Sequence, residues 1–248
     1  MKKYISIFEL FARNTICKIL LVLVAMGTAQ IAMFRKVMYE WMPMDFLYYE
    51  LEIQAVEQYT LEYLVDKSYS LIFMGIAFVL ITAILCLNGC NMGSKSSYTI
   101  QRLQVKEKRI FIMQSIYNSL CYVLLLCTQI GVFFVQGSMY VARAGHVTNQ
   151  TVFLAYYRNA FMHSVLPLEG AMRWSASVLM VLGCGVTTAV FTYLQRRGKI
   201  AWSLFMVVAI TLVGFKQELG NQTSIVMASI IWGIIVISAY IRITQKEE

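Results

Sequence analysis

The sequence predicts an all-α membrane protein with six transmembrane helices and with both chain ends on the cytoplasmic side (N-in/C-in). Of the 248 residues, 59% are hydrophobic and only 14% are charged, whereas a soluble domain has about 45–50% apolar and about 25% charged residues. The apolar residues gather in runs that are each followed by a short charged stretch, which is the pattern of repeated bilayer crossing. The basic residues also gather on one side of the resulting topology.

The first apolar run, residues 16–34, follows a segment that predicts a separate helix. In residues 1–15, Tyr4, Ile7, Phe8 and Phe11 recur at three- and four-residue steps and form one apolar stripe. We therefore expect a short N-terminal amphipathic helix that lies at the membrane interface before the first span. The segment is too long and too amphipathic for the n-region of an ordinary signal peptide, so we interpret it as part of the mature structure.

Five further apolar runs predict the remaining spans. They cover residues 70–90, 110–136, 174–194, 200–215 and 223–241. The third span is long enough to cross the bilayer with tilt or to project beyond it. The stretch at residues 151–167 is moderately apolar, but it holds Arg158, Asn159 and His163 and ends in a proline. We expect that stretch to be interfacial or partly re-entrant, and not a seventh span.

The distribution of charge sets the orientation. With both chain ends in the cytoplasm, the cytoplasmic pieces hold fourteen Lys and Arg residues and four Asp and Glu residues. The outer pieces hold seven Lys and Arg residues and nine Asp and Glu residues. Positive residues thus lie two to one on the inner side, as the orientation rule requires. The cytoplasmic pieces are residues 1–18, 91–109, 195–199 and 242–248. The net charge of +8 belongs to this face, so we expect a lipid bilayer, the plasma membrane, and no nucleic acid as the surroundings of the chain.

Two extracellular segments, residues 35–69 and 137–173, follow the first and third spans. The first holds seven acidic and three basic residues, and from Tyr49 onward its apolar residues predict a helix with one packing face. One interpretation is that this helix lies over the extracellular ends of the spans, with its acidic residues in water. The other is that it forms an extracellular binding surface. In the second case the negative field of Glu50, Glu52 and Glu57 would attract a cationic peptide.

No catalytic motif is present in the sequence. It lacks a G-x-x-x-x-G-K-[ST] phosphate loop, an H-E-x-x-H motif and a G-x-S-x-G motif, and the apolar body of each predicted span lacks acidic residues. We therefore expect that the chain is not an enzyme and that it holds neither cofactor nor metal. The absence of intramembrane carboxylates also argues against a proton- or sodium-coupled carrier.

The third span carries the polar residues Gln114, Asn118 and Gln129, and the first span carries Gln30. Gln114 and Asn118 are four residues apart and therefore share a helix face. One interpretation is hydrogen bonding between helices, worth about 0.6 kcal/mol for each bond. The other is that Gln114, Asn118 and Gln129 form a polar patch beside a translocation path.

The cytoplasmic loop at residues 91–109 carries five basic residues and one acidic residue. Ile100 and Leu103 lie three residues apart on one face, with Arg102 and Lys106 on another, which predicts a short amphipathic helix parallel to the membrane. Such a helix could lie on anionic lipid, or a cytoplasmic partner could bind it.

In this loop the chain resembles the permease subunits of ATP-binding cassette exporters of the second type, which have an amphipathic N-terminal helix, six spans and a coupling helix between spans two and three. The resemblance lies in Tyr98-Thr99, Arg102-Leu103 and Val105, and in residues 163–168 and 195–199. The chain differs in one respect. In well-known exporters the large outer elements lie near spans five and six, whereas here they follow spans one and three.

The resemblance implies a permease half that exports an amphipathic molecule or peptide. A second half, the same or a homologous chain, would complete the route, and ATP-binding cassette ATPase subunits would couple to Tyr98, Ile100, Arg102, Leu103 and Val105. Two alternatives stay open. The chain could be a non-transporting immunity or sensor subunit that binds a peptide with residues 35–69. It could also be the substrate-binding subunit of an energy-coupled vitamin importer, which would need a buried polar ligand pocket.

Overall fold

The computed structural model describes residues 2–41, 60–89, 107–144, 149–166, 171–195, 203–216, 229 and 232–233. The regular structure in these residues is entirely helical. Four of the described helices are long and apolar enough to cross a membrane. They are α1 (Lys2–Trp41), α4 (Ser70–Gly89), α6 (Glu107–Ala144) and α9 (Ala171–Gln195). The prediction of an all-α fold is thereby confirmed for the described residues, and the four apolar helices support the prediction of a membrane protein.

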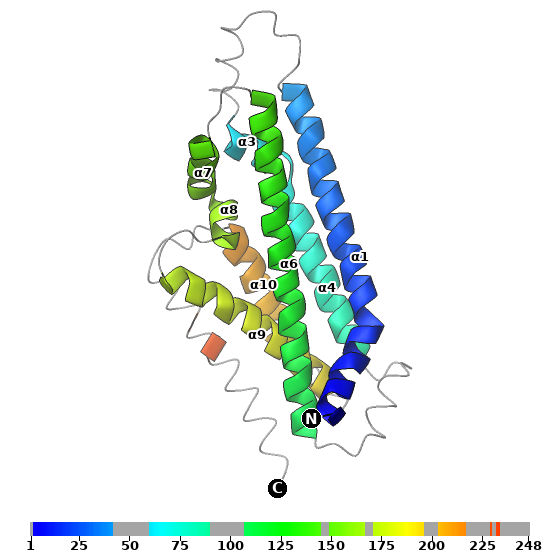
Figure 1. Ribbon diagram of the computed structural model, residues 1–248. Helices are drawn as coiled ribbons and strands as arrows, with labels where there is room; N and C mark the ends of the chain where they lie inside the picture. Colours follow the sequence, from blue (N-terminus) through cyan, green and yellow to red (C-terminus); the bar gives the residue numbers. More distant parts are fainter. Residues whose placement is uncertain are drawn as a thin grey trace, which may run out of the picture.

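The helices α1, α4 and α6 stand side by side along the long axis of the molecule, and α9 crosses α6 obliquely (Figure 1). Four shorter helices pack around them. They are α3 (Leu61–Lys67), α7 (Asn149–Arg158), α8 (Ala160–Val165) and α10 (Ser203–Lys216). The first three of these lie toward the end of the bundle that is opposite to the N terminus (Figure 1).

One continuous helix, α1, runs from Lys2 to Trp41, where the sequence predicts an interfacial helix followed by a span. Phe8 and Phe11 do share a face, as the apolar stripe predicts, but this face packs on α6. The ring centroids of Phe8 and Tyr117 lie 5.3 Å apart, and those of Phe11 and Tyr117 lie 6.3 Å apart. Phe8 and Phe11 therefore pack against protein and do not lie on a membrane surface.

The other predicted spans agree with the described helices to different degrees. The span at residues 70–90 coincides with α4, and the span at 174–194 lies within α9. The span at 110–136 is the middle of the longer helix α6, and 200–215 overlaps α10, which has only 14 residues. Most of the predicted sixth span and most of the loop at 91–109 lie outside the described residues, so the total of six spans stays a prediction.

The stretch at residues 151–167 forms α7 and α8, which are separated at Asn159. At 10 and 6 residues both helices are too short to cross a bilayer. The Asn159 side chain explains the break, because its Oδ1 atom accepts hydrogen bonds from the backbone N–H groups of Phe161 and Met162, both at 3.0 Å. Asn159 thus caps the start of α8. Its Nδ2 atom also donates to Asp66 Oδ1 at 3.0 Å, which ties α8 to α3.

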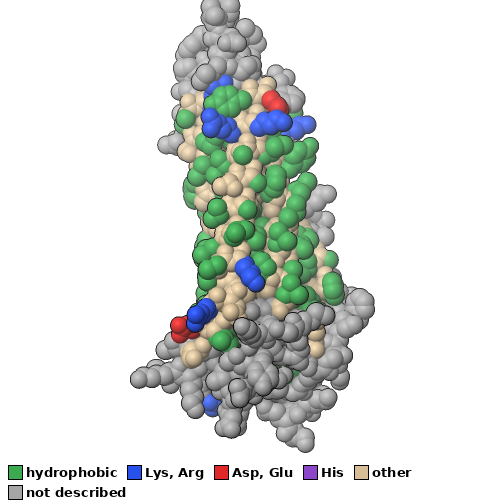
Figure 2. All heavy atoms as spheres, turned by 90° about the vertical axis from the view of Figure 1, so that its right-hand side faces the viewer, with side chains coloured by type: hydrophobic (Ala, Val, Ile, Leu, Met, Phe, Trp, Pro, Cys, Tyr) green, Lys and Arg blue, Asp and Glu red, His purple; other side chains and the backbone are tan. Residues whose placement is uncertain are grey.

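The exposed side of α1 has the dimensions of a lipid-facing surface. Apolar side chains cover this side, with Lys and Arg residues toward both ends (Figure 2); Leu21, for example, is 70% exposed. The 17 residue steps from Lys18 to Arg35 correspond to about 25 Å along a helix. This length is close to the hydrocarbon thickness of a bilayer, about 30 Å. The bundle therefore presents an apolar belt of membrane thickness between two charged ends.

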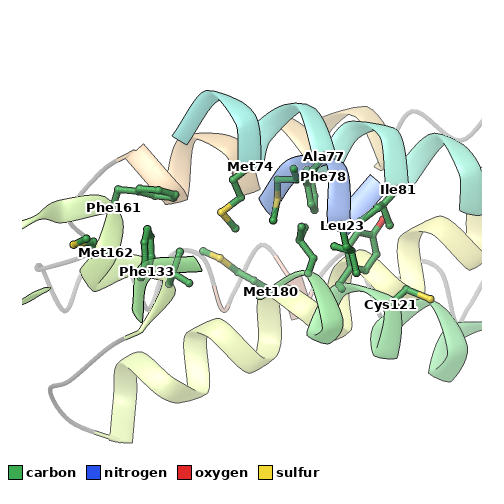
Figure 3. Close-up of a cluster of buried hydrophobic side chains, with 14 of the residues drawn as sticks. Leu23, Met74, Ala77, Phe78, Ile81, Cys121, Phe133, Phe161, Met162 and Met180 are labelled. Carbon is green, nitrogen blue, oxygen red and sulfur yellow. The ribbon is translucent and has the colours of Figure 1, made fainter. Parts of the chain in front are cut away.

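The apolar core lies between α4, α6, α8 and α9, with α1 against its side (Figure 3). Three methionines, Met74, Met162 and Met180, meet there with the aromatic rings of Phe133 and Phe161. Methionine is unbranched and polarisable, so it fills irregular gaps where helices cross at different angles.

Candidate functional site

One buried face of α6 carries a row of polar side chains that runs most of the length of the helix. The residues are spaced four or seven apart, so they fall on one side of the helix. Each is at most 2% exposed. We call this row the polar stripe; it consists of Asn118, Tyr122, Gln129, Gln136 and Tyr140. Leu125 and Phe133 lie between its members.

At the N-terminal half of α6, polar side chains bond the helix to each of its long neighbours. The hydroxyl groups of Tyr117 and Thr15 of α1 lie 2.6 Å apart, and those of Tyr122 and Thr82 of α4 lie 2.9 Å apart. Asn118 Nδ2 donates to Thr188 Oγ1 of α9 at 2.9 Å. Because buried polar groups are costly without partners, these bonds also fix how the helices pair.

A second group, which we call the glutamine cluster, joins α1, α4 and α6 further along. It consists of Gln30, Gln129, Gln136, Ser68 and Ser70. The amides of Gln30 and Gln129 bond to each other in both directions, at 2.9 and 3.0 Å. Gln30 Nε2 also donates to the backbone oxygen of Ser70 at 3.2 Å, and Gln136 Nε2 donates to Ser70 Oγ at 3.3 Å.

The backbone at the start of α4 holds the serines of the glutamine cluster in place. Tyr69, between α3 and α4, has a φ of +55°, a conformation that residues with bulky side chains adopt rarely. Its backbone oxygen accepts hydrogen bonds from Ile72 and Phe73. The hydroxyl groups of Ser68 and Ser70 lie 2.8 Å apart on either side of it. This tight turn directs both serines toward α1 and α6.

The structure places the sequence-predicted polar residues inside the bundle. Asn118 and Gln129 form hydrogen bonds between helices, and Gln114 is buried. These bonds support the interpretation as contacts between helices, and a role in a translocation path stays a prediction. Two other sets lie outside the described residues. They are the coupling residues Tyr98, Ile100, Arg102, Leu103 and Val105, and the surface residues Glu50, Glu52 and Glu57.

Sequence reasoning missed Gln136, Ser70 and the threonine partners on the neighbouring helices. A signal for Gln136 was present, because it follows Gln129 by seven residues and therefore shares its helix face. The hydroxyl groups carry no comparable signal. Threonine and serine are ordinary residues of membrane helices, and their bonds depend on which helices are neighbours.

A groove lies between the C-terminal part of α6 and α7, and we call it the α6–α7 groove. Its volume is about 610 Å³, within the range of pockets that hold a small molecule, about 300–1,000 Å³. Phe134, Gly137 and Val141 of α6 line it together with Val152, Phe153 and Tyr156 of α7. Phe134 and Phe153 are 59% and 57% exposed, so the groove has an apolar rim as well as an apolar floor.

One polar atom of the α6–α7 groove is buried without a partner. Tyr156 is only 6% exposed, and its hydroxyl oxygen has no hydrogen-bond partner among the described residues. Burial raises the pKa of Tyr156 to about 12, because the charged phenolate is poorly solvated there.

The basic segments of the chain adjoin one end of the bundle, and the acidic segment, residues 35–69, adjoins the other end. The start of α1, the end of α4 and the start of α6 lie at one end of the bundle (Figure 1). We call this the basic end, because residues 1–18 and 91–109 include nine Lys and Arg residues and two Glu residues. The opposite end holds the end of α1, α3 and α7, and we call it the far end.

We predict that the basic end faces the cytoplasm. In a variant without native cysteines, Ser96→Cys and Gly198→Cys should resist an impermeant thiol reagent applied to intact cells. Glu57→Cys and Asn149→Cys should react, because they follow helices that point to the other side. Permeabilised cells serve as the control, since all four positions should react there. Labelling of Gly198→Cys in intact cells would contradict the predicted topology.

No protein-family model, curated protein or solved structure matches the chain.

Proposed function

We propose that the chain is the permease half of an ATP-driven transporter that exports an amphipathic molecule or peptide. Separate nucleotide-binding subunits would supply the energy, and a second permease half would complete the route. The observation that carries the proposal is the position of the basic loop. Residues 90–106 connect the end of α4 directly to the start of α6, and these two helices hold most of the polar contacts of the bundle.

A force on this loop would reach α1, α4, α6 and α9 through hydrogen bonds between these helices. The bond between Thr82 and Tyr122 joins α4 to α6, the bond between Asn118 and Thr188 continues to α9, and the reciprocal bonds between Gln30 and Gln129 continue to α1. All these groups are neutral amides and hydroxyls. Rearranging them avoids the cost of moving a buried charge.

The composition of the described spans supports an ATPase as the energy source. Asp and Glu are absent from residues 19–34, 70–89, 110–142 and 174–195. Carriers driven by protons or sodium ions place ionisable groups inside the membrane. An external ATPase is the energy source that this composition favours, and the resemblance of residues 98–105 to a coupling helix favours it as well.

Co-purification with an ATPase subunit tests the proposal. We expect the chain to retain the nucleotide-binding subunit encoded with it when the complex is extracted in mild detergent. Leu103→Asp should abolish this retention and the associated ATP hydrolysis, because a docked charge without a partner costs several kcal/mol. Leu103→Met, which keeps an apolar side chain, is the matched control. If the Leu103→Asp complex assembles and hydrolyses ATP normally, this loop is not the coupling element.

A non-transporting sensor or immunity subunit is the second candidate, and the α6–α7 groove favours it. The two functions predict different complexes. A chain that is stable alone in detergent, binds its ligand and never retains an ATPase would be the sensor.

A further inference from the structure

Two arginine side chains from different helices lie against one aromatic ring near the ends of α1 and α6. The guanidinium group of Arg143 of α6 lies 4.8 Å from the ring centroid of Tyr39 of α1, and that of Arg35 of α1 lies 5.5 Å from the same centroid. The two guanidinium groups are therefore no further apart than the sum of these distances. Each contact is a cation–π interaction, so one ring holds two like charges close together. We call Arg35 and Arg143 the arginine pair.

The acidic residue nearest to Arg35 in the sequence lies on a different side of α1. Glu40 follows Arg35 by five residues, which places it about 140° around the helix. Glu40 Oε1 lies 3.6 Å from Lys36 Nζ, so these two exposed residues form an ion pair of their own. The ion pair has no net charge, whereas the arginine pair brings two positive charges to the Tyr39 side of α1.

An apolar surface leads to the arginine pair along the line where α1 meets α6. A β-carbon added at Gly27 of α1 would lie 3.4 Å from Val132 Cγ2 of α6, so the helices are in contact there. Ile31 follows Gly27 by four residues, and Val135 and Met139 follow Val132 by three and seven residues. These spacings keep all three side chains close to the line of contact. We call Ile31, Val135 and Met139 the α1–α6 seam; Val135 is 41% exposed, and the other two are half-buried.

The arginine pair lies at the end of the α1–α6 seam. Arg35 follows Ile31 by four residues, and Arg143 follows Met139 by four residues, or about 6 Å along each helix. Lys and Arg side chains gather at this end of the apolar side of the bundle (Figure 2). Tyrosine and arginine at the end of a span are typical of the membrane–water interface, where the lipid headgroups lie.

The order of these surfaces, apolar side chains followed by two cations, matches the order of groups in a lipid. We propose that the arginine pair binds the phosphate of an anionic glycerophospholipid, with one acyl chain of the lipid along the α1–α6 seam. An anion between two like charges lowers the electrostatic energy of both. Guanidinium groups suit a phosphate because their planar fork of donors pairs with it in a bidentate way. The inference concerns the lipid next to the chain and does not rest on the permease function.

The arginine pair favours an anionic headgroup over phosphatidylcholine. A quaternary ammonium group binds to the face of an aromatic ring, but the Tyr39 ring already has two guanidinium groups against it. These groups would repel the choline cation. In phosphatidylglycerol the phosphate is the only charged group, so its attraction to the arginine pair is not offset. A soluble phosphate would lack the contact with the α1–α6 seam, which favours a lipid.

Photolabelling of the purified full-length chain tests the inference. The probes are phosphatidylglycerol and phosphatidylcholine with a diazirine in one acyl chain, each added in trace amounts to the chain in phosphatidylcholine nanodiscs. We expect the phosphatidylglycerol probe to label the peptides that hold Ile31 and Val135 at least about fivefold more strongly, the effect of one basic residue near an anionic lipid. Unlabelled phosphatidylglycerol should compete, and inorganic phosphate in large molar excess should not.

Substitution of the arginine pair tests its role at these peptides. Arg35→Gln and Arg143→Gln should each reduce labelling by the phosphatidylglycerol probe about fivefold. Lys36→Gln is the matched control, because it removes the same charge from the neighbouring position on α1, and it should leave the labelling unchanged. Arg35 is exposed, so Arg35→Gln keeps the test valid if Arg143→Gln fails to fold.

Three results would overturn the inference. Equal labelling by the two probes would show that the α1–α6 seam holds any bilayer lipid. Equal losses for Lys36→Gln and Arg35→Gln would show that the lipid responds to net charge alone. Competition by inorganic phosphate would show that the arginine pair binds a soluble anion and not a lipid.

Discussion

Gly185→Val should destabilise the bundle by about 3 kcal/mol, the upper part of the usual range for overpacking. Gly185 lies on α9 where this helix crosses α6. A β-carbon at this position would lie 2.8 Å from the backbone nitrogen of Ser119 and 2.9 Å from its Cα atom. Backbone atoms cannot rotate away as a side chain can, so the helices would have to separate. The bond between Asn118 and Thr188, less than one turn away on each helix, would be broken as well.

The matched control for this prediction is Gly131→Val on α6, where an added β-carbon meets open space. Thermal unfolding of the detergent-solubilised chain, followed by fluorescence-detected size exclusion, compares the two variants. Gly131→Val should match the parent within about 0.5 kcal/mol, as surface substitutions do. Equal midpoints for the two variants would contradict the close approach of α6 and α9.

Gln129→Leu should destabilise the chain by about 1–3 kcal/mol. The substitution removes both bonds of the reciprocal amide pair and leaves the side-chain oxygen of Gln30 without its donor in a fully buried place. Most of this loss of stability comes from the buried side-chain oxygen of Gln30 that is left without a donor, and less comes from the lost hydrogen bonds themselves. The double variant Gln30→Leu with Gln129→Leu should therefore be more stable than the sum of the two single effects predicts.

Equilibrium unfolding of the parent, the two single variants and the double variant gives this comparison. Transport measured on the same four proteins separates a structural role of the amides from a role in transport. A double variant that folds stably and transports normally would show that the pair only holds α1 against α6. A double variant that folds stably and fails to transport would show that the pair of amides takes part in transport. Strictly additive single effects would contradict the reciprocal pair.

The sequence predicts the apolar helices well because a bilayer imposes their length and composition. The bounds of α4 follow directly from its apolar run. The ends of α6 do not, because Gln136, Gly137 and Ser138 resemble the end of a span. In the folded chain Gln136 bonds to Ser70 and Gly137 packs on α7, so the helix continues through them. Hydropathy records only where lipid can lie, and α6 extends to places where protein covers it.

The candidate site is less predictable for a related reason. Gln30 and Gln129 can be identified as polar residues in apolar spans, but their pairing depends on the packing of α1 against α6. The α6–α7 groove combines residues 134–142 with residues 152–166. Its shape depends on the break at Asn159 and on the bond from Asn159 to Asp66, which holds α8 on α3. Periodicity within one segment carries no information about such contacts.

The length of α6 has a mechanical consequence. Its 38 residues span about 57 Å, nearly twice the thickness of the hydrocarbon layer, and the reciprocal amide bonds hold it to α1 at Gln129. From that point the helix extends about 33 Å toward the basic end and about 22 Å toward the far end. Tyr117, Asn118, Tyr122 and Gln136 also bond α6 to its neighbours, so these helices would have to move with α6 in any tilt about Gln129. A tilt of about 10° would shift the far end by about 4 Å and the basic end by about 6 Å in the opposite direction.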